Sequence, residues 1–107
     1  MCFLLEDDGF EIGAAATFGE GRDSIVGCIH PQSILDAIEA ISSSATMPLD
    51  AIFISCTSLK CATIIANAEA QYGIPVISSN SAIAWDMARL ARLATPAGEK
   101  GLLFQQD

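Results

Sequence analysis

The alternation of apolar and polar stretches along the chain predicts an α/β fold. Apolar residues recur at helical spacing over residues 31–43, 59–72 and 82–93. Two short apolar runs, 51–55 and 74–77, separate these helices and are typical of strands buried on both faces. Strands that alternate with helices favour a parallel sheet joined by right-handed crossovers.

The first thirty residues follow a weaker pattern. Residues 1–8 indicate the end of a helix or a disordered start, and Gly9 suits a helix stop. Residues 10–18 predict a third, weak strand, because glycine and alanine have low strand propensity. Residues 22–30 predict an irregular connection.

Length and composition predict one domain over residues 1–107. A hydrophobic share of 51% supplies an ample core, so disorder is not expected. The expected architecture is three layers, α/β/α, around a small and mostly parallel sheet. A loop over 96–101 and an apolar tail at 102–104 that docks on the rest of the domain complete the expectation.

The charge of the chain excludes several classes of partner. The net charge is −8, and residues 1–50 hold nine acidic residues against the single base Arg22. This excess argues against nucleic acid and anionic membrane as partners.

No apolar run approaches the roughly 20 residues that cross a bilayer, and the first residues do not form a signal peptide. We therefore expect a cytoplasmic protein.

The small number of cysteines and histidines limits the metal and redox chemistry that the chain can support. The cysteines are Cys2, Cys28, Cys56 and Cys61, and the histidine is His30. Without a secretory context or a Cys-x-x-Cys pair, neither a disulfide framework nor a thiol redox centre is favoured. A structural zinc site needs more ligands of this kind. We therefore expect no metal.

The candidate for chemistry is Cys56, which directly follows the apolar run 51–55. In an open α/β sheet, ligands bind where the carboxyl end of a strand meets the start of a helix. The helix predicted from Leu59 would stabilise a thiolate at Cys56, and its free N–H groups could hold a substrate carboxylate. Alternatively, Cys56 is a buried small residue that ends a strand.

A second polar junction, Ser78-Ser79-Asn80, ends the next predicted strand. Carboxyl ends of parallel strands share one edge of a sheet, so we expect these residues beside Cys56. They either bind a carboxylate or cap the following helix. Lys60 either contacts the substrate or is an ordinary surface lysine. His30 likewise either has a functional role or is an ordinary loop residue. We expect Cys61 in the core.

Residues 50–60 (DAIFISCTSLK) and 68–91 (AEAQYGIPVISSNSAIAWDMARLA) resemble the maleate isomerase and arylmalonate decarboxylase group of the aspartate/glutamate/hydantoin racemase superfamily. The likeness extends more loosely over residues 9–103. It implies a cofactor-free enzyme built from two similar flavodoxin-like α/β domains, with a cleft between them. Each domain of such an enzyme contributes one strand-end position to the site.

The resemblance implies particular roles for these residues. Cys56 matches the second-domain cysteine that donates a proton, and Thr57 matches the neighbour that helps hold a carboxylate. Ser58, Ser79 and Asn80 complete the expected substrate-binding set. Ser58 replaces the usual asparagine and Lys60 the usual arginine, so the substrate can differ from those of the group. The expected substrate is a small carboxylic or dicarboxylic acid.

The resemblance covers only the second domain of the group. We therefore expect a C-terminal-type domain without its first domain: a fragment, the product of a misassigned gene start, or a copy completed by a partner. The first hypothesis is a cysteine-dependent isomerase or decarboxylase that is a homo-oligomer or needs a complementary first domain. The alternative is a catalytically silent binding or oligomerisation module. The opening strand of the second domain is also expected to be missing, and its absence would leave an exposed sheet edge.

Overall fold

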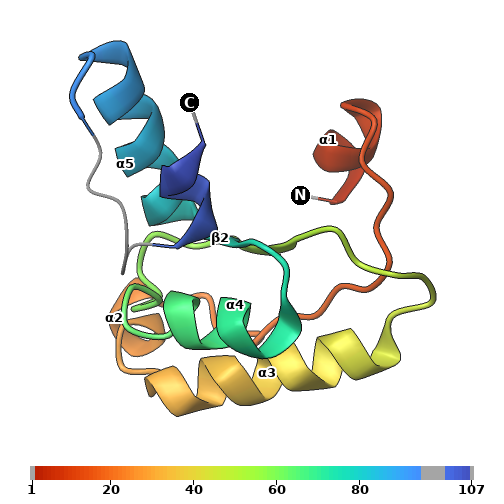
Figure 1. The fold of residues 1–107 in the computed structure, drawn as a ribbon. Helices are drawn as coiled ribbons and strands as arrows, with labels where there is room; N and C mark the ends of the chain where they lie inside the picture. The colour runs from red at the N-terminus through yellow and green to blue at the C-terminus, as the bar shows by residue number, and fades with distance from the viewer. Residues whose placement is uncertain (1, 95–100, 107) are drawn as a thin grey trace.

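A short parallel sheet lies between two groups of helices in the computed structural model, which describes residues 2–94 and 101–106 (Figure 1). In chain order the described elements are α1 (Cys2–Asp7), α2 (Asp23–Val26), α3 (Pro31–Ser44), β1 (Ile52–Ile54), α4 (Ile65–Tyr72), β2 (Val76–Ser78), α5 (Ser79–Leu90) and the 3-10 helix η1 (Leu102–Gln105). The strands pair in the register Ile52↔Val76, Phe53↔Ile77 and Ile54↔Ser78.

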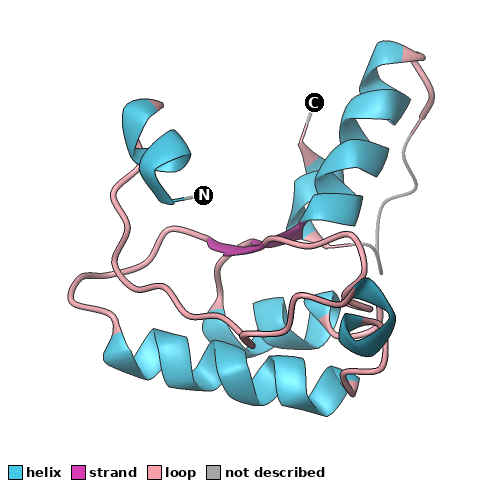
Figure 2. Ribbon diagram, turned by 180° about the vertical axis from the view of Figure 1, so that it is seen from behind, coloured by secondary structure: helices cyan, strands magenta, loops and turns pink. Residues whose placement is uncertain are grey.

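Helices cover both sides of this sheet. In both ribbon views α3 and α4 lie on one side, whereas α5 and η1 rise from the other (Figures 1 and 2). Helix α1 lies on the same side as α5 but apart from it. The predicted α/β class is therefore confirmed. The sheet of the described residues has two strands instead of the expected three.

The core lies between the sheet and the pair α3 and α4. Its buried residues come from the strands, from α2, α3 and α4, and from the loop that precedes α4: Val26, Ile34, Ile38, Ile52, Leu59, Cys61, Ile64, Ile65, Ala68 and Val76. Branched aliphatic side chains dominate this set, as the low aromatic content of 7% requires. Burial of these side chains is the main force that holds the helices to the sheet.

Local sequence explains where the two core helices begin and end. Pro31 occupies the first turn of α3, and the Nδ1 atom of His30 accepts a hydrogen bond from the Gln32 N–H at 3.0 Å. Ile34 and Ile38, one turn apart, are 1% and 3% exposed. Helix α4 ends at Gly73, whose φ of 70° is a left-handed conformation that glycine adopts at little cost.

The strand predicted over residues 10–18 does not form, and the segment is irregular. The residues around Gly13 pack instead against the loop before β1, where the Thr46 N–H donates to the Gly13 carbonyl at 3.3 Å. A Cβ atom at Gly13 would lie 3.0 Å from the Leu49 Cδ2 atom. The glycine and alanines that allow this approach also weaken the segment as a strand.

Several predicted elements differ in their extent from those of the structure. The connection 22–30 contains the short helix α2, and the helix predicted from Leu59 begins at Ile65. Helix α5 starts at Ser79 and ends at Leu90, whereas the sequence predicted residues 82–93. The predicted strands 51–55 and 74–77 form at the positions of β1 and β2, which are shorter or shifted by a residue or two.

Both ends of the described chain follow the expected pattern. Residues 2–7 form α1, and Gly9, with a φ of 95°, follows its end as a helix stop. The apolar tail docks as η1, which contacts α5 and β2. Of the loop predicted over 96–101, residues 96–100 lie outside the described residues.

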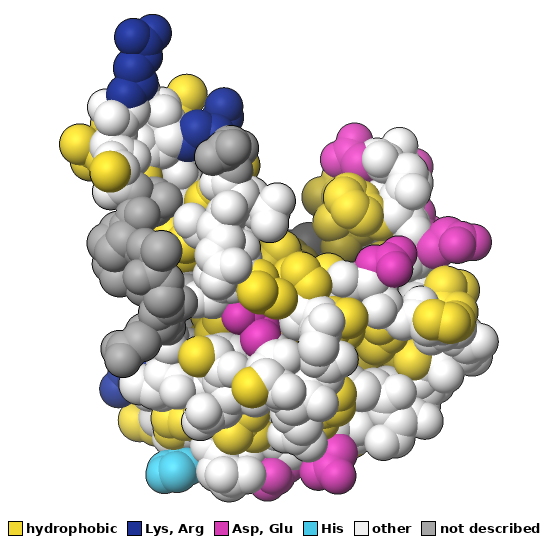
Figure 3. Space-filling view, viewed as in Figure 1, with side chains coloured by type: hydrophobic (Ala, Val, Ile, Leu, Met, Phe, Trp, Pro, Cys, Tyr) yellow, Lys and Arg dark blue, Asp and Glu magenta, His cyan; other side chains and the backbone are white. Residues whose placement is uncertain are grey.

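Charge is unevenly distributed on the surface. Figure 3 shows acidic side chains around α1 and basic side chains at the far end of α5. This separation agrees with the acidic first half and the balanced second half of the sequence. Among the described helices, none is both long and apolar enough to cross a membrane.

Glu69 joins three parts of the fold. This α4 residue is only 8% exposed, and its carboxylate accepts the Val76 N–H at 3.0 Å and the Leu102 N–H at 2.9 Å. Gly101, at a φ of 98°, leaves room for the contact, because a Cβ there would lie 2.9 Å from Ile65 and 3.2 Å from the carboxylate. Glu69 therefore ties the start of β2 and the docked tail to α4.

Replacing Glu69 by alanine is expected to lower the free energy of unfolding by about 3 kcal/mol, because two backbone N–H groups lose a charged acceptor. Urea denaturation of E69A and the wild type measures the difference. Glu39, exposed on α3, supplies the matched control E39A, which we expect to cost little. Equal losses in the two variants would contradict the proposed tie.

Candidate functional site

The two polar junctions predicted from the sequence meet at one edge of the sheet. Ile54 pairs with Ser78 at the carboxyl ends of β1 and β2. Just beyond this pair, the backbone N–H of Cys56 donates a hydrogen bond to the Ser79 Oγ atom at 3.1 Å. The predicted proximity of Cys56 and Ser79 is therefore confirmed by the geometry.

A second hydrogen bond links the same two segments. The side-chain amide of Asn80 donates from its Nδ2 atom to the Thr57 carbonyl at 2.9 Å. Asn80 and Thr57 are both exposed. The structure thus brings together Cys56, Thr57, Ser79 and Asn80, which the sequence proposed as one site.

The sulfur of Cys56 lies within reach of a backbone donor. The Ser58 N–H donates to the Cys56 Sγ atom at 3.4 Å, and both residues are half-buried. This contact places Ser58 in the site through its backbone. Cys56 ends a strand at the accessible edge of the sheet and is not fully enclosed in the core.

The predicted source of thiolate stabilisation was wrong in one respect. The helix dipole does not act at Cys56, because α4 begins at Ile65 and turns occupy the intervening residues. Leu59 and Cys61 are both buried, although residues two apart in a helix point in different directions and do not share a face. Core packing therefore holds this loop in turns. The local donor is the Ser58 N–H of that loop.

Ser78, and not Ser79 or Asn80, caps α5. The Ser78 side chain accepts the Ser81 N–H at 3.0 Å, and the Ser81 Oγ atom accepts the Ser78 N–H at 2.9 Å. This reciprocal pair is a capping box, and Ser78 is 3% exposed. Because Ser78 carries the cap, the side chains of Ser79 and Asn80 are directed to the Cys56 loop.

The other candidates have structural positions. His30 caps α3 through the Nδ1 contact described above. Lys60 is exposed in the loop before α4. Cys61 lies in the core, as predicted, and burial together with the nearby Cys56 raises the pKa of its thiol. No group of three potential metal ligands occurs in the described part of the chain.

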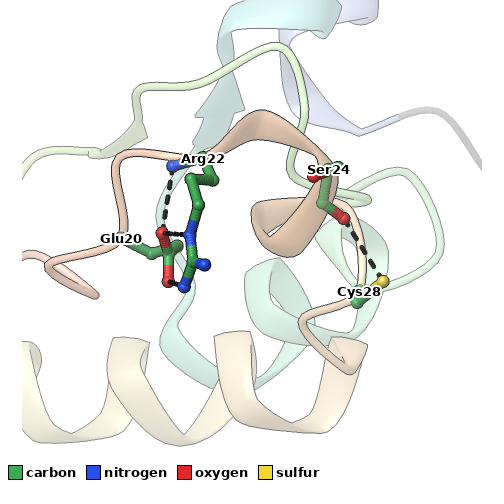
Figure 4. Close-up of polar contacts among 4 residues, drawn as sticks. All are labelled: Glu20, Arg22, Ser24 and Cys28. Atoms are coloured by element: carbon green, nitrogen blue, oxygen red, sulfur yellow. Dashed lines mark hydrogen bonds and ion pairs between the residues drawn. The ribbon is translucent and has the colours of Figure 1, made fainter.

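Two arginines are engaged with neighbouring acids. Arg22 forms a two-pronged contact with Glu20, from Nε at 2.9 Å and Nη2 at 3.1 Å (Figure 4). This contact lowers the pKa of the exposed Glu20 carboxyl and raises the pKa of Arg22. Arg89 contacts Asp86 at 2.6 Å and lies over the Trp85 ring. Neither arginine is among the groups whose hydrogen bonds reach the Cys56 loop.

Cys28 offers a contrasting thiol. It is exposed after α2, and its sulfur donates to the Ser24 carbonyl at 3.3 Å (Figure 4). Its contact with the Ser24 carbonyl involves none of the polar groups that gather at the Cys56 loop. Cys28 is therefore suited as a matched control for experiments on Cys56.

A hollow on the surface lies away from these residues. It is lined by Ala66, Glu69, Ala70, Gly101, Leu102 and Gln105. These residues belong to α4 and to the segment that forms η1. None of the candidate site residues lines this hollow, so the site is defined by the hydrogen bonds at the sheet edge.

Comparison with known proteins gives a family match over almost the whole chain. The family model described as arylmalonate decarboxylase matches residues 1–104. Maleate isomerase of Nocardia farcinica is 30% identical over 104 residues, which are 96% of this chain and 40% of that protein. The chain therefore spans about two fifths of the length of this curated relative.

Two solved structures share the fold. A cysteine-to-serine mutant of the Nocardia farcinica maleate cis-trans isomerase, with a covalently bound succinylcysteine intermediate, has a TM-score of 0.83 and 30% identity. The match covers 96% of this chain and 41% of the isomerase chain. A glycine-to-cysteine mutant of arylmalonate decarboxylase, associated with sulfate, has a TM-score of 0.81 at 25% identity. There the shares are 95% of this chain and 44% of the other.

Stability should depend on alkaline pH through Cys61, whose pKa is raised by burial and by the nearby Cys56. The unfolded chain loses this proton first, so the unfolded state binds fewer protons and the free energy of unfolding falls above about pH 8.5. Urea denaturation from pH 7 to 10 measures the slope. C61A is expected to flatten it, whereas C28A keeps it. A slope unchanged in C61A would contradict this assignment.

Proposed function

Because the chain belongs to the arylmalonate decarboxylase family, we propose that it carries the proton-donating half of a cofactor-independent isomerase or decarboxylase site. The substrate is a small carboxylic or dicarboxylic acid. Cys56 moves a proton at the carbon beside the carboxylate. The observation that carries the proposal is the Ser58 N–H contact to the Cys56 sulfur, at the edge where Ser79 and Asn80 converge.

Neutral donors suit a carboxylate in this setting. The Ser79 oxygen accepts the Cys56 N–H, so its hydroxyl proton can point to a ligand. The Asn80 amide uses one N–H for the Thr57 carbonyl and retains a second. The exposed Thr57 hydroxyl and the half-buried Ser58 hydroxyl complete the proposed substrate-binding set. Hydrogen bonds of this kind stabilise charge that develops on a carboxylate.

Decarboxylation requires one thiol. The bond between the α-carbon and the leaving carboxylate breaks, carbon dioxide departs, and the electron pair remains as an enediolate. The Cys56 S–H then gives its proton to the α-carbon and takes one back from solvent. The hydrogen bonds to the remaining carboxylate act where the negative charge accumulates.

Isomerisation requires two groups. A succinylcysteine, as held by the Nocardia farcinica enzyme, has gained sulfur on one carbon of a double bond and hydrogen on the other. In this chain Cys56 is the proposed proton donor. The nucleophilic sulfur would come from a complementary first domain or a second copy of the chain. Rotation about the new single bond, followed by loss of sulfur and proton, gives the trans product.

The setting of this activity is also part of the proposal. We place the protein in the cytoplasm, because the free thiols Cys28, Cys56 and Cys61 suit a reducing compartment. The assignment of the chain as a second domain that a first domain completes rests on the two-fifths coverage of the curated relative.

Replacing Cys56 by alanine is expected to lower turnover at least about a hundredfold, the scale of a lost proton donor. Proton NMR in D₂O follows an arylmalonate and maleate in parallel, and deuterium at the α-carbon reports the transferred proton. C28A is the matched control and should keep wild-type turnover. Retained activity in C56A, or no turnover of the arylmalonate by the wild type, would contradict the proposal for this chain, because decarboxylation needs only the one thiol.

A second candidate function is a non-catalytic module that associates with itself. Among the described residues β1 and β2 pair only with each other, so each strand has an unpaired outer edge. Phe53 on β1 and Met87 on α5 are 45% and 65% exposed. Exposed apolar side chains of this size mark contact surfaces when they lie together.

Self-association is expected to make the apparent mass rise with protein concentration. Sedimentation from 5 to 200 µM (about the range in which weak contacts saturate) measures it. F53K is expected to shift the mass towards the monomer, because a charge on an exposed strand opposes edge pairing. Lysine at the exposed position Gln71 is the control. A wild type that stays monomeric throughout would count against this candidate.

A further inference from the structure

The hydrogen bonds that join the two strands change in kind just beyond the sheet. The backbone pairing ends at Ile54↔Ser78, because α5 begins at Ser79 and its backbone turns into a helix. From that point side chains make the connection: Ser79 accepts the Cys56 N–H, and Asn80 donates to the Thr57 carbonyl. We refer to these two contacts as the Ser79–Asn80 clasp.

We infer that Ser79 and Asn80 are positioning residues, which hold the loop 55–58 so that the Ser58 N–H points at the Cys56 sulfur. The importance of this role for catalysis rests on the proposed function. The role itself is a statement about loop geometry and can be tested without any turnover. It is additional to the substrate contact proposed above for the same two residues, which uses the Ser79 O–H and the second Asn80 N–H.

The clasp has a rigid base. Ser79 and Asn80 lie in the first turn of α5, directly after the capping box of Ser78 and Ser81. Helix α5 in turn contacts β2 and η1. Side chains that project from a fixed helical turn hold a neighbouring loop more accurately than loop residues hold one another.

Each residue type suits its contact. A serine oxygen is short enough to reach a backbone N–H in the next segment and accepts while keeping its own proton free. The asparagine amide supplies the donor that a carbonyl needs. With both contacts made, Cys56 and Thr57 have their backbone groups held across 23 residues of sequence. The turn that brings Ser58 back to the sulfur is then fixed at two successive residues.

Amide hydrogen exchange followed by NMR tests the clasp at single residues. In S79A the Cys56 N–H loses its acceptor directly, and we expect the Ser58 N–H to exchange about tenfold faster as well, because the sulfur is no longer held in place. S79T keeps the hydroxyl and should restore both rates to within about threefold of the wild type. The amides of Val76 and Ile52 should stay protected, since Glu69 and Pro75 still accept them.

The decisive amide is that of Ser58, which does not contact Ser79. Faster exchange at Cys56 alone in S79A, with Ser58 unchanged, would overturn the positioning role. If S79A unfolds, shown by lost protection at Val76 and Ile52, the near-isosteric N80D decides. It removes the donor to Thr57 on an exposed side chain. Faster Ser58 exchange in N80D supports the clasp, and an unchanged rate overturns it.

Kinetics separate this role from substrate binding. With a substrate that the wild type turns over, S79A should lower kcat about tenfold because the geometry of Cys56 is lost, whatever rise in KM the lost substrate contact adds. S79T should recover kcat. A raised KM with kcat unchanged would show that Ser79 binds substrate and does not position the thiol. Failure of the proposed function leaves the exchange experiment unaffected, so the two ideas fail separately.

Discussion

Parallel pairing of β1 with β2 is the constraint on which the candidate site depends. The register sets Ile54 opposite Ser78, so the residues that follow both strands emerge at one edge. A shift of one residue would turn Ile52 and Val76, which lie in the core, to the opposite face. Burial of those two side chains therefore holds the register, and the register brings Cys56 to Ser79. Core packing and candidate chemistry are linked through two short strands.

A two-stranded sheet of this size needs support from outside its own ladder. Glu69 provides part of it, because one buried carboxylate accepts the first N–H of β2 and an N–H of η1. The capping box at Ser78 and Ser81 provides another part, since it starts α5 at the strand end without an irregular connection. Both features keep β2 and α5 in line, and the Ser79–Asn80 clasp uses that alignment.

The hydrogen bonds that reach the Cys56 loop come from neutral groups and not from the two paired arginines. Arg22 is paired with Glu20, and Arg89 is paired with Asp86. The groups that converge on the Cys56 loop are hydroxyls, an amide and backbone N–H groups. Neutral donors attract a distant carboxylate less strongly than cations do, but they form well-directed hydrogen bonds once the carboxylate is in contact. They suit a reaction in which charge develops on a carboxylate that is already bound.

The sequence by itself determined the α/β class, the two strands, the core helix near 31–43 and the existence and end of the helix predicted over 59–72, because these depend on local hydrophobic period and on proline and glycine at helix ends. It also placed Cys56 and Ser79 at neighbouring strand ends, since parallel strands share an edge. Tertiary structure alone decided that α4 begins at Ile65. Burial of Leu59 and Cys61 overrides the helix propensity of that loop. The partners of Glu69 lie 7 and 33 residues away, and no local pattern in the sequence signals them. For Ser79 and Asn80 the sequence signalled their proximity to the Cys56 loop but not the hydrogen bonds that they make there.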